Sequence, residues 1–149
     1  MLVGEVDAGD TAAEFPSKAP GCPANAAAYV EHALPGGKAV IFTASVYPEC
    51  GADAACHKKQ ADKLASGPVQ AHLADSLLYR HWTSYREFQY SHLFSCDLDT
   101  GTVTMLTGGK ADYPAYNHGN GPGFAVSPDG REICVVFNPD PRPETSTNS

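Results

Sequence analysis

Basic residues are scarce in this sequence, and it contains no long apolar run. The chain of 149 residues has 10 Lys and Arg against 17 Asp and Glu, which gives a formal net charge of −7. No more than two basic residues are adjacent, at Lys58 and Lys59, so no basic stripe could neutralise a phosphate backbone. No apolar run approaches the roughly 20 residues that a membrane helix needs. We therefore expect no nucleic-acid partner and no membrane span, and we see no signal peptide because the N-terminus lacks a basic region.

The sequence also has few stretches without glycine or proline, and these two residues interrupt long regular elements. The chain contains 14 Gly and 12 Pro, while 42% of its residues are hydrophobic. This composition predicts one domain with a packed core, many turns and short elements, and it argues against a long helical bundle.

Cysteine is sparse, and the five residues leave at least one thiol unpaired in a monomer. Cys50 and Cys56 bracket a short polar loop, which suits a local disulfide in an oxidising compartment, although both could stay reduced. Cys96 and Cys134 lie in apolar, strand-like surroundings and are expected to be small buried side chains.

The chain divides into a leader, residues 1–37, and a β-rich part, residues 38–149. The leader is rich in Ala, Pro and Gly, is acidic, and is expected to be loosely ordered. Within it, residues 25–34 could form a short helix that Pro35 ends. Beyond it, we expect strands from Lys38 to Ala44, from Ser91 to Leu98 and from Val103 to Thr107, with a hairpin between the last two.

A further pair of strands, 123–127 and 132–137, flanks the turn Pro128-Asp129-Gly130, where Pro presets φ and Gly supplies a positive φ. Between the first two strands of the β-rich part lies a long insertion, residues 45–90. Its first half predicts a helix over 53–65, with Asp53 as N-cap and Gly67-Pro68 after its end. Its second half fits both a helical and a strand period.

The strand-turn-strand segment 124–137 resembles the SPDG repeats of TolB-like β-propellers. A wider set of segments, in order and spacing, is similar to the N-terminal β-propeller of bacterial prolyl oligopeptidase family serine peptidases, in the dipeptidyl and acylaminoacyl peptidase branch. These segments are 42–48, Cys50 to Cys56 with Lys58-Lys59, 78–82, 91–94 with Asp97-Leu98, Leu106-Thr107 and 146–148. The resemblance covers residues 38–148.

The resemblance implies a mainly β fold, a partial β-propeller of about one and a half blades of antiparallel sheet with a long, partly helical insertion. It also implies that residues 77–83 are extended and pair in a long hairpin with Ser91 to Leu98. Too few strands are present to close a ring of blades.

The chemistry of such peptidases is missing from this chain. Their nucleophile lies in a G-x-S-x-G elbow of an α/β-hydrolase domain. No serine here has glycine at both −2 and +2; Ser66, followed by Gly67, fails this test. We therefore expect no catalytic residue and no cofactor in this chain. We expect it to be a fragment of a substrate-gating propeller that is inactive alone, and to meet peptide substrate only through the missing domain.

The alternative is a free-standing propeller-repeat module that binds a partner or self-assembles into a homo-oligomer through open blade edges. The family resemblance implies a periplasmic or secreted protein in either case.

Three insertion residues are candidates for a position near substrate: Arg80, His81 and Trp82. Arg80 could meet a carboxylate. Alternatively, Trp82 anchors the insertion and Arg80 pairs with an acid such as Asp75. Cys50, Cys56 and His57 have the ligand types that zinc prefers but the wrong spacing, so we expect no metal.

Two polar segments have ordinary explanations. The glycine-rich stretch 119–123, which follows Asp112 and Tyr113, is not followed by a helix, so it is expected to connect two blades rather than to bind phosphate. Asp97 and Asp99 are expected to be turn acids.

Overall fold

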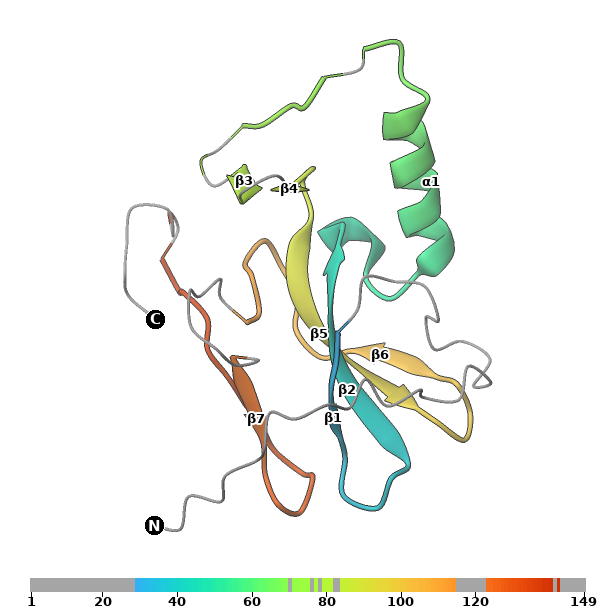
Figure 1. Ribbon diagram of the computed structural model, residues 1–149, viewed down its shortest axis with the longest axis vertical. Coiled ribbons are helices and arrows are strands. Elements are labelled where there is room, and N and C mark those ends of the chain that lie inside the picture. Colours follow the sequence, from blue (N-terminus) through green and yellow to red (C-terminus); the bar gives the residue numbers. More distant parts are fainter. Residues whose placement is uncertain are drawn as a thin grey trace.

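The computed structural model describes residues 29–69, 71–75, 77, 79–81, 84–114, 123–140 and 142, and its described part is mainly β (Figure 1). The main sheet has four antiparallel strands in the order β1-β2-β5-β6. Their bounds are Tyr29–Ala33 (β1), Ala39–Val46 (β2), Tyr90–Asp97 (β5) and Val103–Met105 (β6). Strands that are consecutive in this sheet are also consecutive in the chain, apart from the insertion between β2 and β5.

The two central strands, β2 and β5, carry the core because both of their faces are covered. On one face lie Val40, Phe42, Val46, Phe94 and Cys96, and on the other lie Ile41 and Leu93 with Phe124 of the second sheet. Phe42 and Phe94 are cross-strand partners, and their rings stack with centroids 5.4 Å apart. A strand that is buried on both faces has apolar residues in succession rather than in alternation with polar ones. This explains the continuous apolar run at the start of β2.

The N-terminal strand corrects an expectation. The helix expected over residues 25–34 is wrong, because β1 pairs with β2 as an edge strand, with a bulge between Val30 and His32. A short isolated helix is marginal in water, whereas pairing with a buried strand satisfies the backbone and outweighs the helix propensity of alanine. The expected leader, 1–37, thus supplies a strand of the sheet, and residues 1–28 lie outside the described residues.

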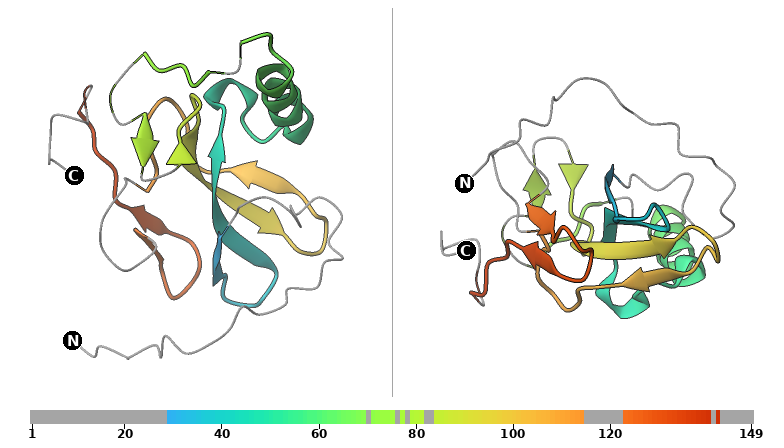
Figure 2. Two further views of the ribbon diagram at one scale, coloured as in Figure 1. Left: turned by 45° about the horizontal axis from the view of Figure 1, so that its top comes forward. Right: turned by 90° about the horizontal axis from the view of Figure 1, so that it is seen from below.

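A second, two-stranded sheet joins β7, Phe124–Val126, to β8, Ile133–Val135. The strand-turn-strand prediction is confirmed here, although both strands are shorter than expected. Gly130 takes the positive φ of 70° in the turn. The sheet lies beside the main sheet in both views of Figure 2, and it buries Phe124 against Ile41 and Leu93.

The insertion holds the 3-10 turn η1, Pro48–Cys50, the helix α1, Ala54–Ala65, and a small hairpin of β3, Arg80–His81, with β4, Ser84–Tyr85. The expected helix is confirmed, and Asp53 caps it by accepting hydrogen bonds from the backbone N–H groups of Ala55 and Cys56. No residue of α1 is buried, and the helix projects from one end of the molecule (Figure 1).

The long hairpin expected between residues 77–83 and Ser91 to Leu98 is wrong. Strand β5 already has β2 on one side and β6 on the other, so neither of its edges is open to the insertion. Arg80 and His81 pair instead with Tyr85 and Ser84. The hairpin expected between β5 and β6 is confirmed.

The remaining cysteines depart from expectation in two ways. Cys96 is buried as expected, but it is disulfide-bonded, to a partner outside the described residues. Cys134 is a free thiol and is exposed, because β8 has only its inner face covered. Within the described residues, no helix is long and apolar enough to cross a membrane.

Candidate functional site

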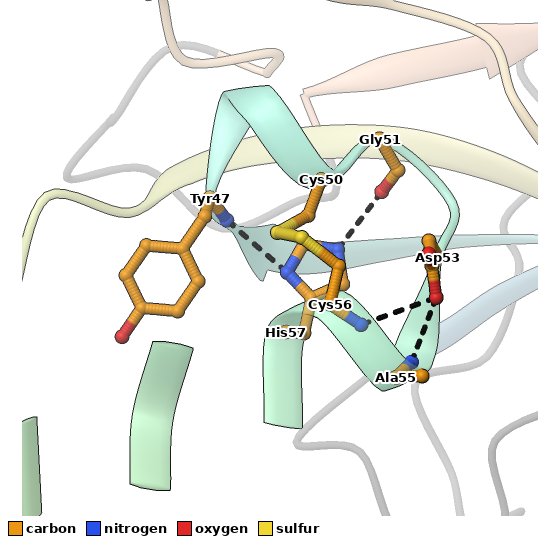
Figure 3. Close-up of a disulfide and its surroundings, with 7 residues drawn as sticks. All are labelled: Tyr47, Cys50, Gly51, Asp53, Ala55, Cys56 and His57. Carbon is orange, nitrogen blue, oxygen red and sulfur yellow. Dashed lines mark hydrogen bonds between the residues drawn. A yellow bond between two sulfur atoms is a disulfide. The ribbon is translucent and has the colours of Figure 1, made fainter. Parts of the chain in front are cut away.

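The insertion between β2 and β5 is fixed to the sheet at its first turn, where β2 ends (Figure 3). Cys50 of η1 and Cys56 of α1 form a disulfide, with Cα atoms 5.5 Å apart. The cysteine pair singled out in the sequence is thus bonded in the structure, and Cys50 is itself buried. The bond ties a helix that buries none of its own residues to the end of a core strand.

His57 reinforces the same junction. Its Nε2 lies 2.9 Å from the Gly51 carbonyl oxygen, which can only accept, so this nitrogen carries the proton. Its Nδ1 accepts from the backbone N–H of Tyr47 at 3.4 Å. Both ring nitrogens and both sulfur atoms are therefore engaged, which removes the zinc ligands considered from sequence. Within the described part of the chain, no group of three or more His, Cys, Asp or Glu side chains could hold a metal ion.

Tyr85 is the centre of an aromatic cluster at the far end of the insertion. The His72 ring stacks on it, with centroids 3.5 Å apart and planes within 4°. The His72 Nδ1 also contacts the Glu87 carboxylate, and Tyr79 lies 6.4 Å from Tyr85, ring to ring. The cluster orders a hairpin that consists of only two residues on each strand.

Arg80 belongs to this cluster. Its side chain is exposed, and its guanidinium carbon lies 6.0 Å from the centroid of the Tyr85 ring, a cation-π geometry. The partner of Arg80 in the structure is thus an aromatic ring. The sequence had suggested either the carboxylate of a substrate or an acidic side chain such as Asp75. His81 is placed only through its backbone pairing with Ser84, and Trp82 lies outside the described residues.

Large apolar side chains are exposed among the described residues of the second half of the insertion. Their exposed fractions range from 38% to 67%, and they are Val69, Leu73, Leu77, Tyr79, Tyr85 and Phe88. Leu73, Tyr79 and Phe88 line one small hollow together with Arg86 and Tyr90. Of the six, these three side chains are shown to lie together, and clustered exposed apolar groups are typical of a surface that contacts another molecule.

Residues 106–113, which we call the strap, follow β6 and continue along β5. A buried histidine, His92, holds this strap, and the sequence had not marked it as a site residue. His92 is fully buried; its Nε2 lies 3.1 Å from the Gly109 carbonyl and its Nδ1 lies 3.0 Å from the Thr107 hydroxyl. The Thr107 hydroxyl also accepts from the backbone N–H of Leu93. In the neutral imidazole, Nε2–H donates to the Gly109 carbonyl and Nδ1 accepts from the Thr107 hydroxyl, so both ring nitrogens are paired within the fold.

Burial lowers the pKa of His92 below its ordinary value, while the hydrogen bond to Gly109 and the nearby Asp112 carboxylate act in the opposite direction. A histidine within an apolar strand was the one sequence signal for this site. Its role here is to hold the strap, because both ring nitrogens are used within the fold.

Asp112 fastens the end of the same strap. Its carboxylate accepts from the backbone N–H of Ser91 and pairs with Arg86, whose guanidinium lies over the Tyr90 ring. Residues 115–122, which include most of the glycine-rich stretch, lie outside the described residues. Asp97 is a turn acid as expected: it accepts from the backbone of Asp99 and Thr100, and the hydrogen bond from the Thr100 backbone lowers the pKa of its carboxyl.

Comparison with models of known protein families, with curated proteins and with solved structures found no match.

Proposed function

We propose that this chain forms part of the β-propeller of a prolyl oligopeptidase-like serine peptidase, and that this propeller screens peptide substrates by size and access. In this proposal β1, β2, β5 and β6 are the four strands of one blade. Strands β7 and β8 open the next blade. The chain supplies no nucleophile, and hydrolysis takes place on a separate α/β-hydrolase domain.

The packing of the second sheet on the main sheet is the observation that carries the proposal. Propeller blades are four-stranded antiparallel sheets that bury their faces against their neighbours. The order β1-β2-β5-β6 has this form, and Phe124 of β7 is buried against Ile41 and Leu93 of the main sheet.

The SPDG turn supports the same arrangement. The Ser127 hydroxyl accepts from the backbone N–H groups of Arg131 and Glu132, so the turn is closed by its own serine. A Cβ atom on Gly130 would lie 3.0 Å from the ring of Pro35, between β1 and β2. Glycine is thus required here both by a positive φ and by the close approach of the two sheets.

The insertion supports a role at a molecular boundary. It leaves the main sheet at the end of β2, and it carries exposed apolar side chains of the kind that would suit contact with a peptide or with the hydrolase domain. The Cys50–Cys56 disulfide agrees with a periplasmic or secreted location, where such bonds persist.

The proposal is tested by reading the open reading frame beyond the codon for Ser149 and by assaying the purified chain. We expect further SPDG repeats and a G-x-S-x-G elbow in frame, together with no hydrolysis of peptide nitroanilides and no labelling by a fluorophosphonate. Turnover by the chain alone that a serine-directed inhibitor abolishes would overturn the proposal, as would a frame with no elbow.

A further inference from the structure

The strap meets β5 on both sides of His92. The backbone N–H of Leu93 donates to the Thr107 hydroxyl, and that of Ser91 donates to the Asp112 carboxylate. The carbonyls of Leu93 and Ser91 accept from backbone N–H groups at the two ends of the strap, at 2.8 Å in each case. Strand β2 pairs with the opposite edge of β5, so the strap can detach without breaking that ladder.

The hydrogen bonds of His92 suit a neutral ring. The imidazole is fully buried, and it donates to Gly109 and accepts from Thr107. A proton on Nδ1 would turn the accepting nitrogen into a second donor, facing a hydroxyl that already accepts from Leu93. It would also place a positive charge where no water reaches it. Closing of the strap therefore favours the neutral form of His92.

Among the described residues, little charge faces His92 to compensate such a proton. Strands β2 and β6 contain no charged residue. On the strap, the Tyr113 ring stacks beside His92, Lys110 is exposed, and the nearby Asp112 carboxylate is already paired with Arg86. Burial outweighs the effect of Asp112, so the pKa of His92 lies below its ordinary value. Exposure of the ring to water would restore that value, and acid therefore favours an open strap.

The strap also holds the turn that joins β4 to β5. Asp112 pairs with Arg86, whose backbone N–H donates to the Tyr79 carbonyl at 2.8 Å. The next two residues, Glu87 and Phe88, have φ angles of 50° and 61° although neither is glycine. Such a backbone is strained and persists only where neighbouring contacts hold it. Glu87 and Phe88 line the small hollow of the insertion, so the ion pair of Arg86 supports one wall of that hollow.

We propose that the strap is an acid-released latch: when His92 gains a proton, the strap leaves β5, Asp112 releases Arg86, and the strained turn that lines the hollow relaxes. At higher pH the closed strap keeps the hollow in the form that the structure shows. The latch goes beyond the proposed function, because it adds control by pH to the surface of the insertion. It depends only on contacts among β5, the strap and the turn, so it can hold or fail independently of the propeller assignment.

Hydrogen exchange of the full 149-residue chain tests the latch. It is followed by NMR between about pH 7.5 and about pH 5 and is corrected for the intrinsic exchange rate. The reporter amides are those of Ser91 and Leu93, which donate to strap side chains, and that of Arg86. Opening takes up one proton, so we expect their opening constants to rise by up to about tenfold for each pH unit below 6.5. The amides of β2 should open at least about tenfold less at every pH, because they require unfolding of the sheet.

His92→Gln removes the proposed sensor. The amide group of Gln can donate to Gly109 and accept from Thr107, so the strap should stay closed and the pH dependence of the reporter amides should vanish. The matched control is His57→Gln, at another histidine with both ring nitrogens bonded within the fold, and it should keep the native profile.

Asp112→Asn tests whether Asp112 is the sensor instead. Asn keeps an oxygen for the Ser91 N–H but loses the charge that pairs with Arg86 and favours protonated His92. We expect the reporter amides to open more at every pH, and the rise with acid to persist and extend to lower pH. A rise that Asp112→Asn abolishes and His92→Gln leaves in place overturns the proposal.

Other results also overturn it. Reporter amides of the native chain that open equally at every pH show that no latch exists. Reporter amides that open no more readily than those of β2 show that release is unfolding of the whole sheet, and a flat profile at Arg86 beside rising profiles at Ser91 and Leu93 shows that the turn is not released. If His92→Gln fails to fold, the ring nitrogen resonances of native His92 decide: we expect the ring to titrate together with the opening of the strap, and titration with the strap closed contradicts the latch.

Discussion

The central strands and the insertion are held in place by different forces. Strands β2 and β5 bury Ile41, Leu93 and Cys96 almost completely, whereas α1 buries no residue and most large apolar side chains of the insertion are exposed. Hydrophobic burial stabilises the sheet, and a disulfide with a few hydrogen bonds holds the start of the insertion. The more stable region therefore sets the fold, and the less stable region is the one available for contact with other molecules.

The largest expected difference comes from truncating one side chain in each region. Phe94→Ala removes a ring that is 3% exposed and stacks on Phe42, so the free energy of unfolding should fall by about 3 to 5 kcal/mol. Leu73→Ala, at a side chain that is 63% exposed, should change it by no more than about 0.5 kcal/mol. Urea unfolding measures both, and equal losses would contradict the contrast.

Removing the disulfide should affect the insertion and spare the sheet. The Cys50→Ser/Cys56→Ser variant loses a short covalent loop, which is worth about 2 kcal/mol in the chain-entropy model. Because little else holds α1, the helical signal in circular dichroism should fall while the sheet signal persists. Cys134→Ser is the control and should leave both signals unchanged; loss of the whole fold would show that the sheet depends on α1.

A smaller, pH-dependent effect should appear within the sheet. The pKa of His92 is lowered in the folded state, so the unfolded chain binds more protons as pH falls. The stability contributed by neutral His92 should be fully present above its ordinary pKa of 6.5 and be lost as pH falls from there towards the folded-state value. His92→Gln should flatten the pH dependence of the unfolding free energy, and an unchanged slope would contradict this role.

The most local of the expected losses is confined to α1. Asp53→Ala removes the N-cap that accepts from Ala55 and Cys56, and it should cost about 1 kcal/mol of helix stability. Asp53→Asn keeps an accepting oxygen and should cost less. The melting of the helical signal compares the two variants, and identical curves would show that the cap contributes nothing.

The elements that sequence predicted well are those specified by short-range chemistry. Asp53 as N-cap, the Pro128-Asp129-Gly130 turn and the hairpin between β5 and β6 each depend on a few neighbouring residues. Strand β1 and the pairing of β5 with β2 depend on contacts between distant segments, and the alanine-rich sequence before Pro35 carried the opposite local preference. Pattern alone does not name a strand's partner.

At the site, the local pair Cys50 and Cys56 was visible from its spacing, whereas the clamp of His92, Thr107 and Gly109 was not. Its three members come together only when the strap folds back along β5. The exposure of Cys134 was missed for a related reason, because an apolar run does not reveal how many layers cover it.

Hydrogen exchange of the native chain and of the Cys50→Ser/Cys56→Ser variant, read residue by residue, tests the contrast between sheet and insertion most directly. We expect the amides of β2 and β5 to exchange slowly in both proteins. The amides of α1 should be protected in the native chain and exchange rapidly in the variant. Undiminished protection of α1 in the variant, or rapid exchange across β2 and β5 in the native chain, would contradict this description.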